Sequence, residues 1–105
     1  MPRLVALYNV PEDPTAFDAH YSDVHSPIVA RYPNLRDVRL TRPLGVAGRP
    51  APYHLVVEMI FDTDADLAAA LSSEAGIESA RDLRNFASAG VTLFIAPDAE
   101  PAPDA

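Results

Sequence analysis

The chain contains no cysteine, no lysine and no tryptophan. Without cysteine it can form no disulfide, thiolate metal site or thiol nucleophile, and without lysine it can form no Schiff base. It also lacks an apolar run near the roughly 20 residues of a membrane span, and its first residues do not resemble a secretory leader. We therefore expect a cytoplasmic protein with no membrane partner.

Basic charge is scarce as well. The sequence has 15 acidic and 8 basic residues, for a formal net charge of −7 at pH 7. Four arginines between residues 36 and 49 lie close together in the sequence, but Asp37 interrupts them. Nucleic-acid binding needs a basic face that neutralises phosphates. We therefore expect no nucleic-acid partner.

Length and composition indicate one small domain. The 105 residues are 49% hydrophobic, which is enough for a genuine core. We place this single domain over residues 1–96. Residues 97–105 contain only proline, alanine and acidic residues. We expect this acidic, Pro/Ala-rich tail to be disordered and dispensable.

Alternation of apolar residues predicts four strands, at residues 3–9, 35–42, 53–61 and 90–96. The first is apolar on both sides, as in a central strand, and the third keeps a period of two over nine residues. Residues 43–52 hold three prolines and two glycines, so we expect a long loop between the second and third strands.

Two helices are expected between these strands. Asp13 can cap the first, with Pro14 at its first position. One stripe of this helix holds apolar residues at spacings of four, three and four, namely Phe17, Tyr21, Val24 and Ile28. Pro27 predicts a kink or break near Ser26. The second helix begins after residues 62–64 and is expected to break or bend at Gly76.

The order strand, helix, strand, strand, helix, strand is typical of an α+β, ferredoxin-like β-α-β-β-α-β fold, a four-stranded antiparallel sheet with two helices on one face. The other face would then expose the second apolar side of the first and third strands, more than a monomer usually tolerates. We expect a homodimer that covers this open sheet face.

His25 is the strongest candidate for acid–base chemistry. It lies four residues after Tyr21 and beside the predicted break at Pro27, where a bend leaves room for a ligand. A histidine at a helix edge is often only half-exposed or bonded to backbone, so a structural role stays open, as it does for His20 and His54. In an α-helix His20 and His25 would lie about 140° apart, since each residue advances the helix by about 100°. They would not share a face, and we expect no metal site.

Several short motifs resemble the EthD family, small members of the dimeric α+β barrel superfamily. The first is the run from Tyr8 to Pro14 leading to Phe17, followed by His20-Tyr21 and His25-Ser26-Pro27. The second is the closing segment 82–92. The resemblance implies a dimer whose two sheets form a barrel, and a hydrophobic cavity between the first helix and the sheet of each protomer.

The resemblance also implies a set of site residues. Its motifs carry over five pocket residues, His25, Tyr21, Tyr8, Asn85 and Phe86. We expect His25 and Tyr21 to be catalytic, with Tyr21 or Tyr53 orienting the substrate. We expect the substrate to contact Tyr8, Phe17, Tyr53, Asn85 and Phe86. Related barrels include cofactor-free monooxygenases, isomerases and cyclases. The absence of cysteine and tryptophan argues against thiol-assisted isomerisation and against a tryptophan-lined oxygenase pocket.

Our leading hypothesis is a protein that binds a small, mostly apolar, oxygenated metabolite of a catabolic pathway, with His25 as acid or base and no cofactor. It would perform cofactor-free acid–base or oxygenase-type chemistry. The alternative is a non-catalytic binding or accessory module, because paired catalytic groups are scarce. Haem handling is a third, weaker hypothesis, since it needs a histidine that faces a cavity large enough for a porphyrin.

Overall fold

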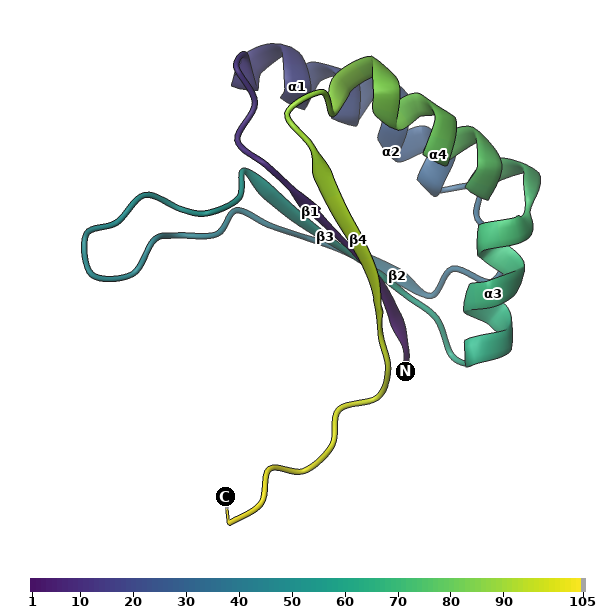
Figure 1. Ribbon diagram of the computed structural model, residues 1–105. Helices are drawn as coiled ribbons and strands as arrows, with labels where there is room; N and C mark the ends of the chain where they lie inside the picture. Colours follow the sequence, from purple (N-terminus) through teal and green to yellow (C-terminus); the bar gives the residue numbers. More distant parts are fainter. Residues whose placement is uncertain (105) are drawn as a thin grey trace.

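The sheet of the computed structural model, which describes residues 1–104, is covered by helices on one face only (Figure 1). Its strands lie in the order β2-β3-β1-β4 and every neighbouring pair is antiparallel. Their bounds are β1 (Arg3–Tyr8), β2 (Asp37–Thr41), β3 (Leu55–Ile60) and β4 (Val91–Ala96). The predicted α+β, ferredoxin-like fold is confirmed, with strand ends up to two residues inside the predicted ones.

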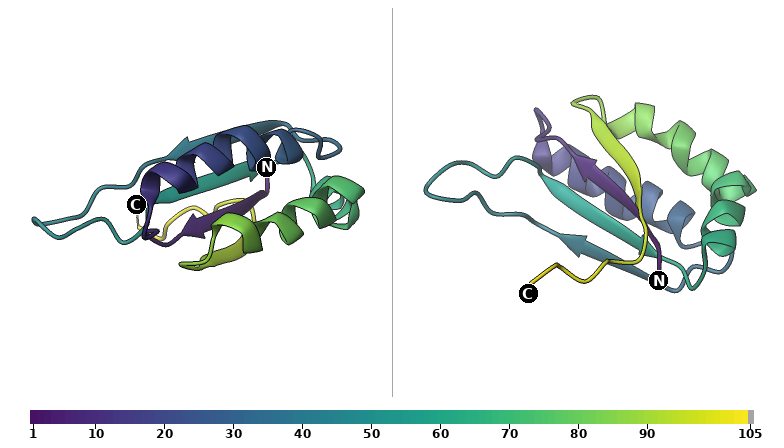
Figure 2. Two further views of the ribbon diagram at one scale, coloured as in Figure 1. Left: turned by 90° about the horizontal axis from the view of Figure 1, so that it is seen from above. Right: turned by 60° about the horizontal axis from the view of Figure 1, so that its bottom comes forward.

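Two helical segments lie side by side over this face, as Figure 2 shows. The first is continuous and consists of α1 (Pro14–His20), the π-helical turn η1 (Tyr21–His25) and α2 (Ser26–Val29). The second consists of α3 (Asp64–Ser72) and α4 (Glu74–Phe86). Within residues 1–104, no helix is both long and apolar enough to cross a membrane.

The first helical segment begins as predicted, because the Asp13 carboxylate accepts a hydrogen bond from the Ala16 N–H and Pro14 opens the helix. Of the kink or break predicted near Ser26, the break is wrong, since Ser26 keeps helical dihedral angles. Its N–H instead donates to the Tyr21 carbonyl, five residues back. This wider turn accommodates Pro27, which cannot donate to a carbonyl four residues back and would crowd it in a regular α-helix.

The second helical segment changes direction at Ser73, three residues before the predicted position. Ser73 has extended dihedral angles, and its hydroxyl accepts a hydrogen bond from the Gly76 N–H, which caps α4. Gly76 lies in the first turn of α4, where a Cβ would come within 2.2 Å of the Ala70 carbonyl oxygen. Glycine is therefore required here because two helix ends approach closely.

The pairing of the strands shows which side chains lie on each face of the sheet. Leu4, Ala6 and Tyr8 of β1 point toward the helices, where they pack in the core with residues of β3. The opposite face has no helix over it and carries apolar side chains beside the Arg3–Glu58 ion pair. These side chains are Val5, Leu7, Val56 and Phe94.

Two segments extend from this body. The loop between β2 and β3 projects beyond the sheet edge in every view (Figures 1 and 2), and Leu44 and Val46 near its tip are exposed. Residues 97–104 follow β4 without helix or strand, and Asp98 contacts the amino-terminal ammonium group. Ala105 lies outside the described residues. The disorder expected for the tail stays a prediction.

Candidate functional site

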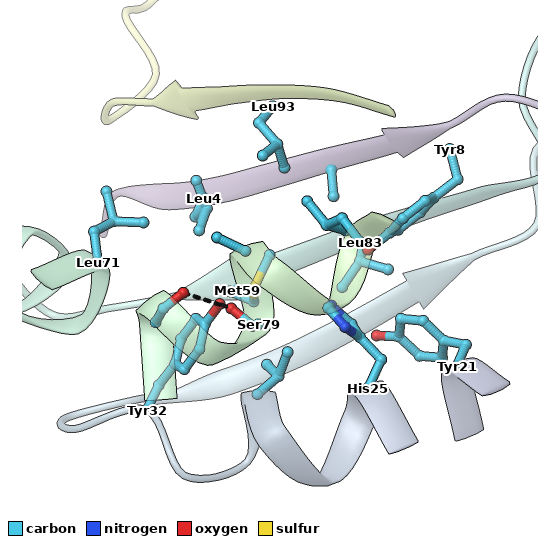
Figure 3. A pocket seen from close by; sticks show the side chains of 15 residues that line it. Leu4, Tyr8, Tyr21, His25, Tyr32, Met59, Leu71, Ser79, Leu83 and Leu93 are labelled. Carbon is cyan, nitrogen blue, oxygen red and sulfur yellow. Dashed lines mark hydrogen bonds between the residues drawn. The ribbon is translucent and has the colours of Figure 1, made fainter. Parts of the chain in front are cut away.

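A small apolar pocket lies between the two helical segments and the sheet (Figure 3). Its volume is about 70 Å³. Its walls are mostly aliphatic and come from both helical segments and from β1, β3 and β4, with Leu4, Val29, Val57, Met59, Leu83 and Leu93 among the lining residues. Pockets that bind drug-sized ligands have volumes of roughly 300–1,000 Å³, so this pocket suits a much smaller molecule and has no room for a porphyrin.

Polar side chains lie at two places in this apolar lining. Tyr8, Tyr21 and His25 form one group, and Tyr32, hydrogen-bonded to Ser79, forms the other. Figure 3 shows His25 and Tyr21 side by side, away from the Tyr32–Ser79 pair. A ligand in the pocket would therefore contact mainly carbon atoms and meet hydrogen-bonding groups at its ends.

His25 is held by a buried carboxylate. Its Nδ1 lies 3.0 Å from the Asp82 Oδ2, and the two side chains are only 5% and 7% exposed. Because a carboxylate only accepts hydrogen bonds, His25 Nδ1 must carry the proton. Among residues 1–104 nothing hydrogen-bonds to His25 Nε2, yet no buried side-chain nitrogen or oxygen lacks both a partner and access to open space. Nε2 therefore has some access to open space, and the His25 ring lines the pocket.

Asp82 also binds His20 and Asn85. His20 Nε2 lies 2.9 Å from Oδ1 and 3.0 Å from Oδ2, and Asn85 Nδ2 donates to Oδ1 at 3.0 Å. The expectation that His20 and His25 would lie on different faces is thus wrong. In the π-helical turn η1 each hydrogen bond spans five residues, so the two imidazoles, five residues apart, come to the same side.

A cluster of aromatic side chains packs against both histidines. Phe86 stacks on His20 with ring centroids 4.9 Å apart and lies 4.8 Å from the ring of His25. Phe17 and Tyr8 complete this cluster around Phe86. These contacts hold the planes of both imidazoles, including that of His25 at the pocket wall.

Burial determines the protonation states at the site. It lowers the pKa of His25, against the opposing effect of Asp82, so the imidazole is neutral at neutral pH. It raises the pKa of Tyr21 to about 12 and raises that of Tyr8 as well, so both phenols keep their protons. Burial alone would raise the pKa of Asp82, but hydrogen bonds from Asn85, His20 and His25 outweigh it and lower that pKa. The site therefore combines one neutral base with two hydroxyl donors.

The structure brings three of the seven predicted site residues to the pocket, namely His25, Tyr21 and Tyr8. Phe86 and Phe17 are buried in the aromatic cluster behind it, and Asn85 supports Asp82. Tyr53 does not line the pocket and is only partly buried, just before β3. Register explains this position, because Leu55 is the first residue of β3 that pairs with β1.

His54 belongs to a separate cluster at the surface. Its Nε2 lies 2.9 Å from the Asp18 Oδ1, and Arg42 donates to the same oxygen at 3.0 Å. Its ring packs edge-on against Phe17. Burial would raise the pKa of Asp18, but hydrogen bonds from His54 and Arg42 lower it. This cluster joins α1 to the base of the long loop and does not touch the pocket.

Sequence reasoning missed Asp82, Tyr32 and Ser79. The buried residues of α4 recur at spacings of four, three and four, at Ala75, Ser79, Asp82 and Phe86. Two of these four residues are polar, so their burial is evident only in the structure, where the Asp82 carboxylate requires partners. Within residues 1–104 there is no group of three or more His, Cys, Asp or Glu side chains arranged to hold a metal ion.

Solved structures of low identity share this fold. SnoaB of Streptomyces nogalater, a cofactor-independent oxygenase, is 16% identical with a TM-score of 0.67, over 98% of this chain and 97% of its own. A dimeric protein of unknown function from Bacteroides fragilis, with a ferredoxin-like fold, is 9% identical with a TM-score of 0.62, over 90% of this chain and 93% of its own. At these identities the likeness shows the fold alone.

Closer matches identify the family. An uncharacterized 11.0 kDa protein of Rhodococcus erythropolis, from the thcB-thcC intergenic region, is 35% identical over 90% of this chain and 91% of its own length. The crystal structure of an ethyl tert-butyl ether d (ethd) family protein of Bacillus halodurans is 36% identical, covering 94% of this chain and 99% of its own, with a TM-score of 0.87. Residues 10–90 match the profile of the EthD domain. The chain therefore belongs to the EthD family.

Proposed function

We propose that this protein binds a small, mostly apolar molecule with a carbonyl or phenol oxygen, and that His25 acts on it as a cofactor-free acid–base catalyst. One observation carries the proposal. An imidazole fixed by a buried carboxylate at Nδ1 lines an apolar pocket together with two tyrosines, and its Nε2 has no hydrogen-bond partner among the described residues.

The chemistry follows from the protonation states. Neutral His25 can take a proton at Nε2 from a carbon next to a carbonyl or from a phenol hydroxyl. Negative charge then develops on the ligand oxygen. Tyr21 and Tyr8 line the same pocket and remain protonated, so their O–H groups can donate to that oxygen. The proton on Nε2 returns to the same carbon or to another, which makes exchange or isomerisation the simplest outcome.

Pocket size narrows the ligand class. About 70 Å³ of space favours a small aliphatic or monocyclic molecule over a polycyclic one. The exposed side chains of Leu71 and Leu93 border the pocket and offer an apolar entry. The oxygenase activity of SnoaB agrees with cofactor-free chemistry on this fold, but a different substrate is expected here.

Hydrogen–deuterium exchange tests the proposal. Cyclopentanone in D₂O is incubated with the protein, and loss of its α-proton signals is followed by NMR. We expect exchange above the buffer rate, reduced about 10²–10⁴-fold in the His25→Gln variant. His54→Gln is the matched control, because His54 also contacts an aspartate but lies outside the pocket, and it should exchange as fast as the wild type.

Two results would contradict acid–base catalysis. One is that the α-protons of cyclopentanone and the ring protons of phenol both exchange only at the buffer rate, although NMR shows that both molecules bind in the pocket. This result would favour the non-catalytic binding module. The other is exchange that persists unchanged in His25→Gln.

We also propose that the helix-free face of the sheet forms a homodimer interface. Phe94 on this face is 44% exposed and lies beside other apolar side chains. The dimeric Bacteroides protein of the same fold agrees with this arrangement. Light scattering should give the mass of two chains at micromolar concentration, and Phe94→Asp should give one. A wild-type monomer would contradict the interface.

A further inference from the structure

We propose that His20 is a positioning residue that adjusts the basicity of His25 through the carboxylate that the two histidines share. The inference rests on the function proposed for His25, but its test needs neither ligand nor turnover. Nothing in the reaction proposed above uses His20, although this residue lies within hydrogen-bond distance of both oxygens of Asp82.

The geometry joins the pocket to the surface in three steps. His25 lines the pocket and is 5% exposed, Asp82 is 7% exposed, and the His20 side chain is 25% exposed. Asp82 is the middle group, because its Oδ2 lies 3.0 Å from a nitrogen of each imidazole. Solvent can therefore reach His20 while His25 remains enclosed.

One carboxylate cannot fully support two imidazolium ions. With His20 neutral, the charge of Asp82 is available to stabilise a proton on His25. When His20 takes up a proton, it neutralises that charge and adds a like charge nearby, so His25 becomes a weaker base. The two imidazoles then take up protons with negative coupling. Protonation of a surface group thereby reduces the strength of a base inside the pocket.

The π-helical turn makes this sharing possible. In a regular α-helix the two histidines would point about 140° apart, and one carboxylate on α4 could not bond both. η1 brings them together opposite Asp82, and Phe86 packs on both rings. The π-helical turn, a rare geometry, thus lies at the place where it brings His20 and His25 to the same carboxylate.

Other charged and titratable groups near the pair come from each packed element. Tyr8 of β1 and Tyr21 of η1 border the pocket with His25. Glu12 and Asp13, before α1, border a surface groove with His20. Three further residues of α4 border a groove with Asp82, namely Glu78, Arg81 and Arg84. Among these groups only Asp82 hydrogen-bonds to either imidazole in the described part of the chain.

The test is a histidine titration by NMR on ligand-free, ¹⁵N-labelled protein. His20→Gln removes the charge but keeps an N–H donor for Asp82, and His20→Phe removes the charge but keeps an aromatic ring against Phe86. Both variants should shift the titration of His25 to higher pH and make it a single step. His54→Gln removes a histidine from the separate cluster and should leave the curve of His25 unchanged.

Each outcome decides the matter. An upward shift of the His25 curve in both His20 variants, absent in His54→Gln, supports the coupling. A His25 curve in His20→Gln that overlays the wild-type curve overturns it, as does an equal shift in His54→Gln. Because no substrate is present, these results stand even if the exchange experiment shows that the protein catalyses nothing.

Discussion

Replacement of Asp82 by Asn tests the organisation of the site most severely. The carboxylate accepts hydrogen bonds from His20, His25 and Asn85. An asparagine of the same shape has one accepting oxygen, and its NH₂ group would face a donor. At least one imidazole must then lose its partner or move its proton to the other ring nitrogen.

The expected loss of stability in Asp82→Asn depends on which imidazole N–H is left without an acceptor. A buried donor that loses its acceptor costs about 1–3 kcal/mol. His25 is almost fully buried, whereas His20 can turn to water, so we expect a total loss of about 1–3 kcal/mol in the free energy of unfolding. Asp18→Asn changes a carboxylate that also bonds a histidine but is 43% exposed, and it should cost only about 0–1 kcal/mol.

Two measurements check this prediction. Urea denaturation at pH 7 gives the stability difference, and two-dimensional ¹H–¹⁵N NMR gives the His25 tautomer. In the wild type the proton should be on Nδ1, and in Asp82→Asn it should move at least partly to Nε2, which removes the free base from the pocket. A variant as stable as Asp18→Asn that retains an Nδ1 proton on His25 would refute the reasoning.

Three further predictions concern the stability of the fold. Gly76→Ala should destabilise the fold by about 1–3 kcal/mol in urea denaturation, because its Cβ would meet the Ala70 carbonyl; an unchanged midpoint would contradict the close approach. Because the folded-state pKa of His25 is lowered, the unfolded chain binds more protons as pH falls below about 6.5, so stability should decrease from there toward the folded-state pKa. In His25→Gln this part of the pH dependence should disappear. Deletion of residues 97–105 should leave the melting temperature unchanged. The ion pair that it removes, between Asp98 and the amino-terminal ammonium group, is exposed and contributes little to stability.

Most of the fold could be predicted from the sequence because its signals are local and repeated. Alternation located the strands to within two residues, and the Asp13–Pro14 pair located the start of α1. Gly76 was correctly singled out, but its role is a contact between helix ends and not a break. A contact between segments has no periodic signal, so only the structure could distinguish the two.

The site was less predictable, for a physical reason. Angular arguments about His20 and His25 assumed α-helical geometry, and a single π-helical turn reverses their result. π-Helical turns are rare and have no propensity scale to reveal them. The burial of Asp82 beside Ser79 in α4 has no apolar pattern in the sequence, and the position of Tyr53 depended on the residue at which β3 begins.

A crystal structure of the protein soaked with cyclopentanone would test the central claim most directly. The account predicts density in the pocket, with the ketone oxygen within about 2.6–3.2 Å of a hydroxyl of Tyr21 or Tyr8 and an α-carbon facing His25 Nε2. The same soak of His25→Gln should retain the ligand, since most of the lining is aliphatic. A pocket that stays empty, or a ligand that binds only at the His54–Asp18 cluster, would contradict the account.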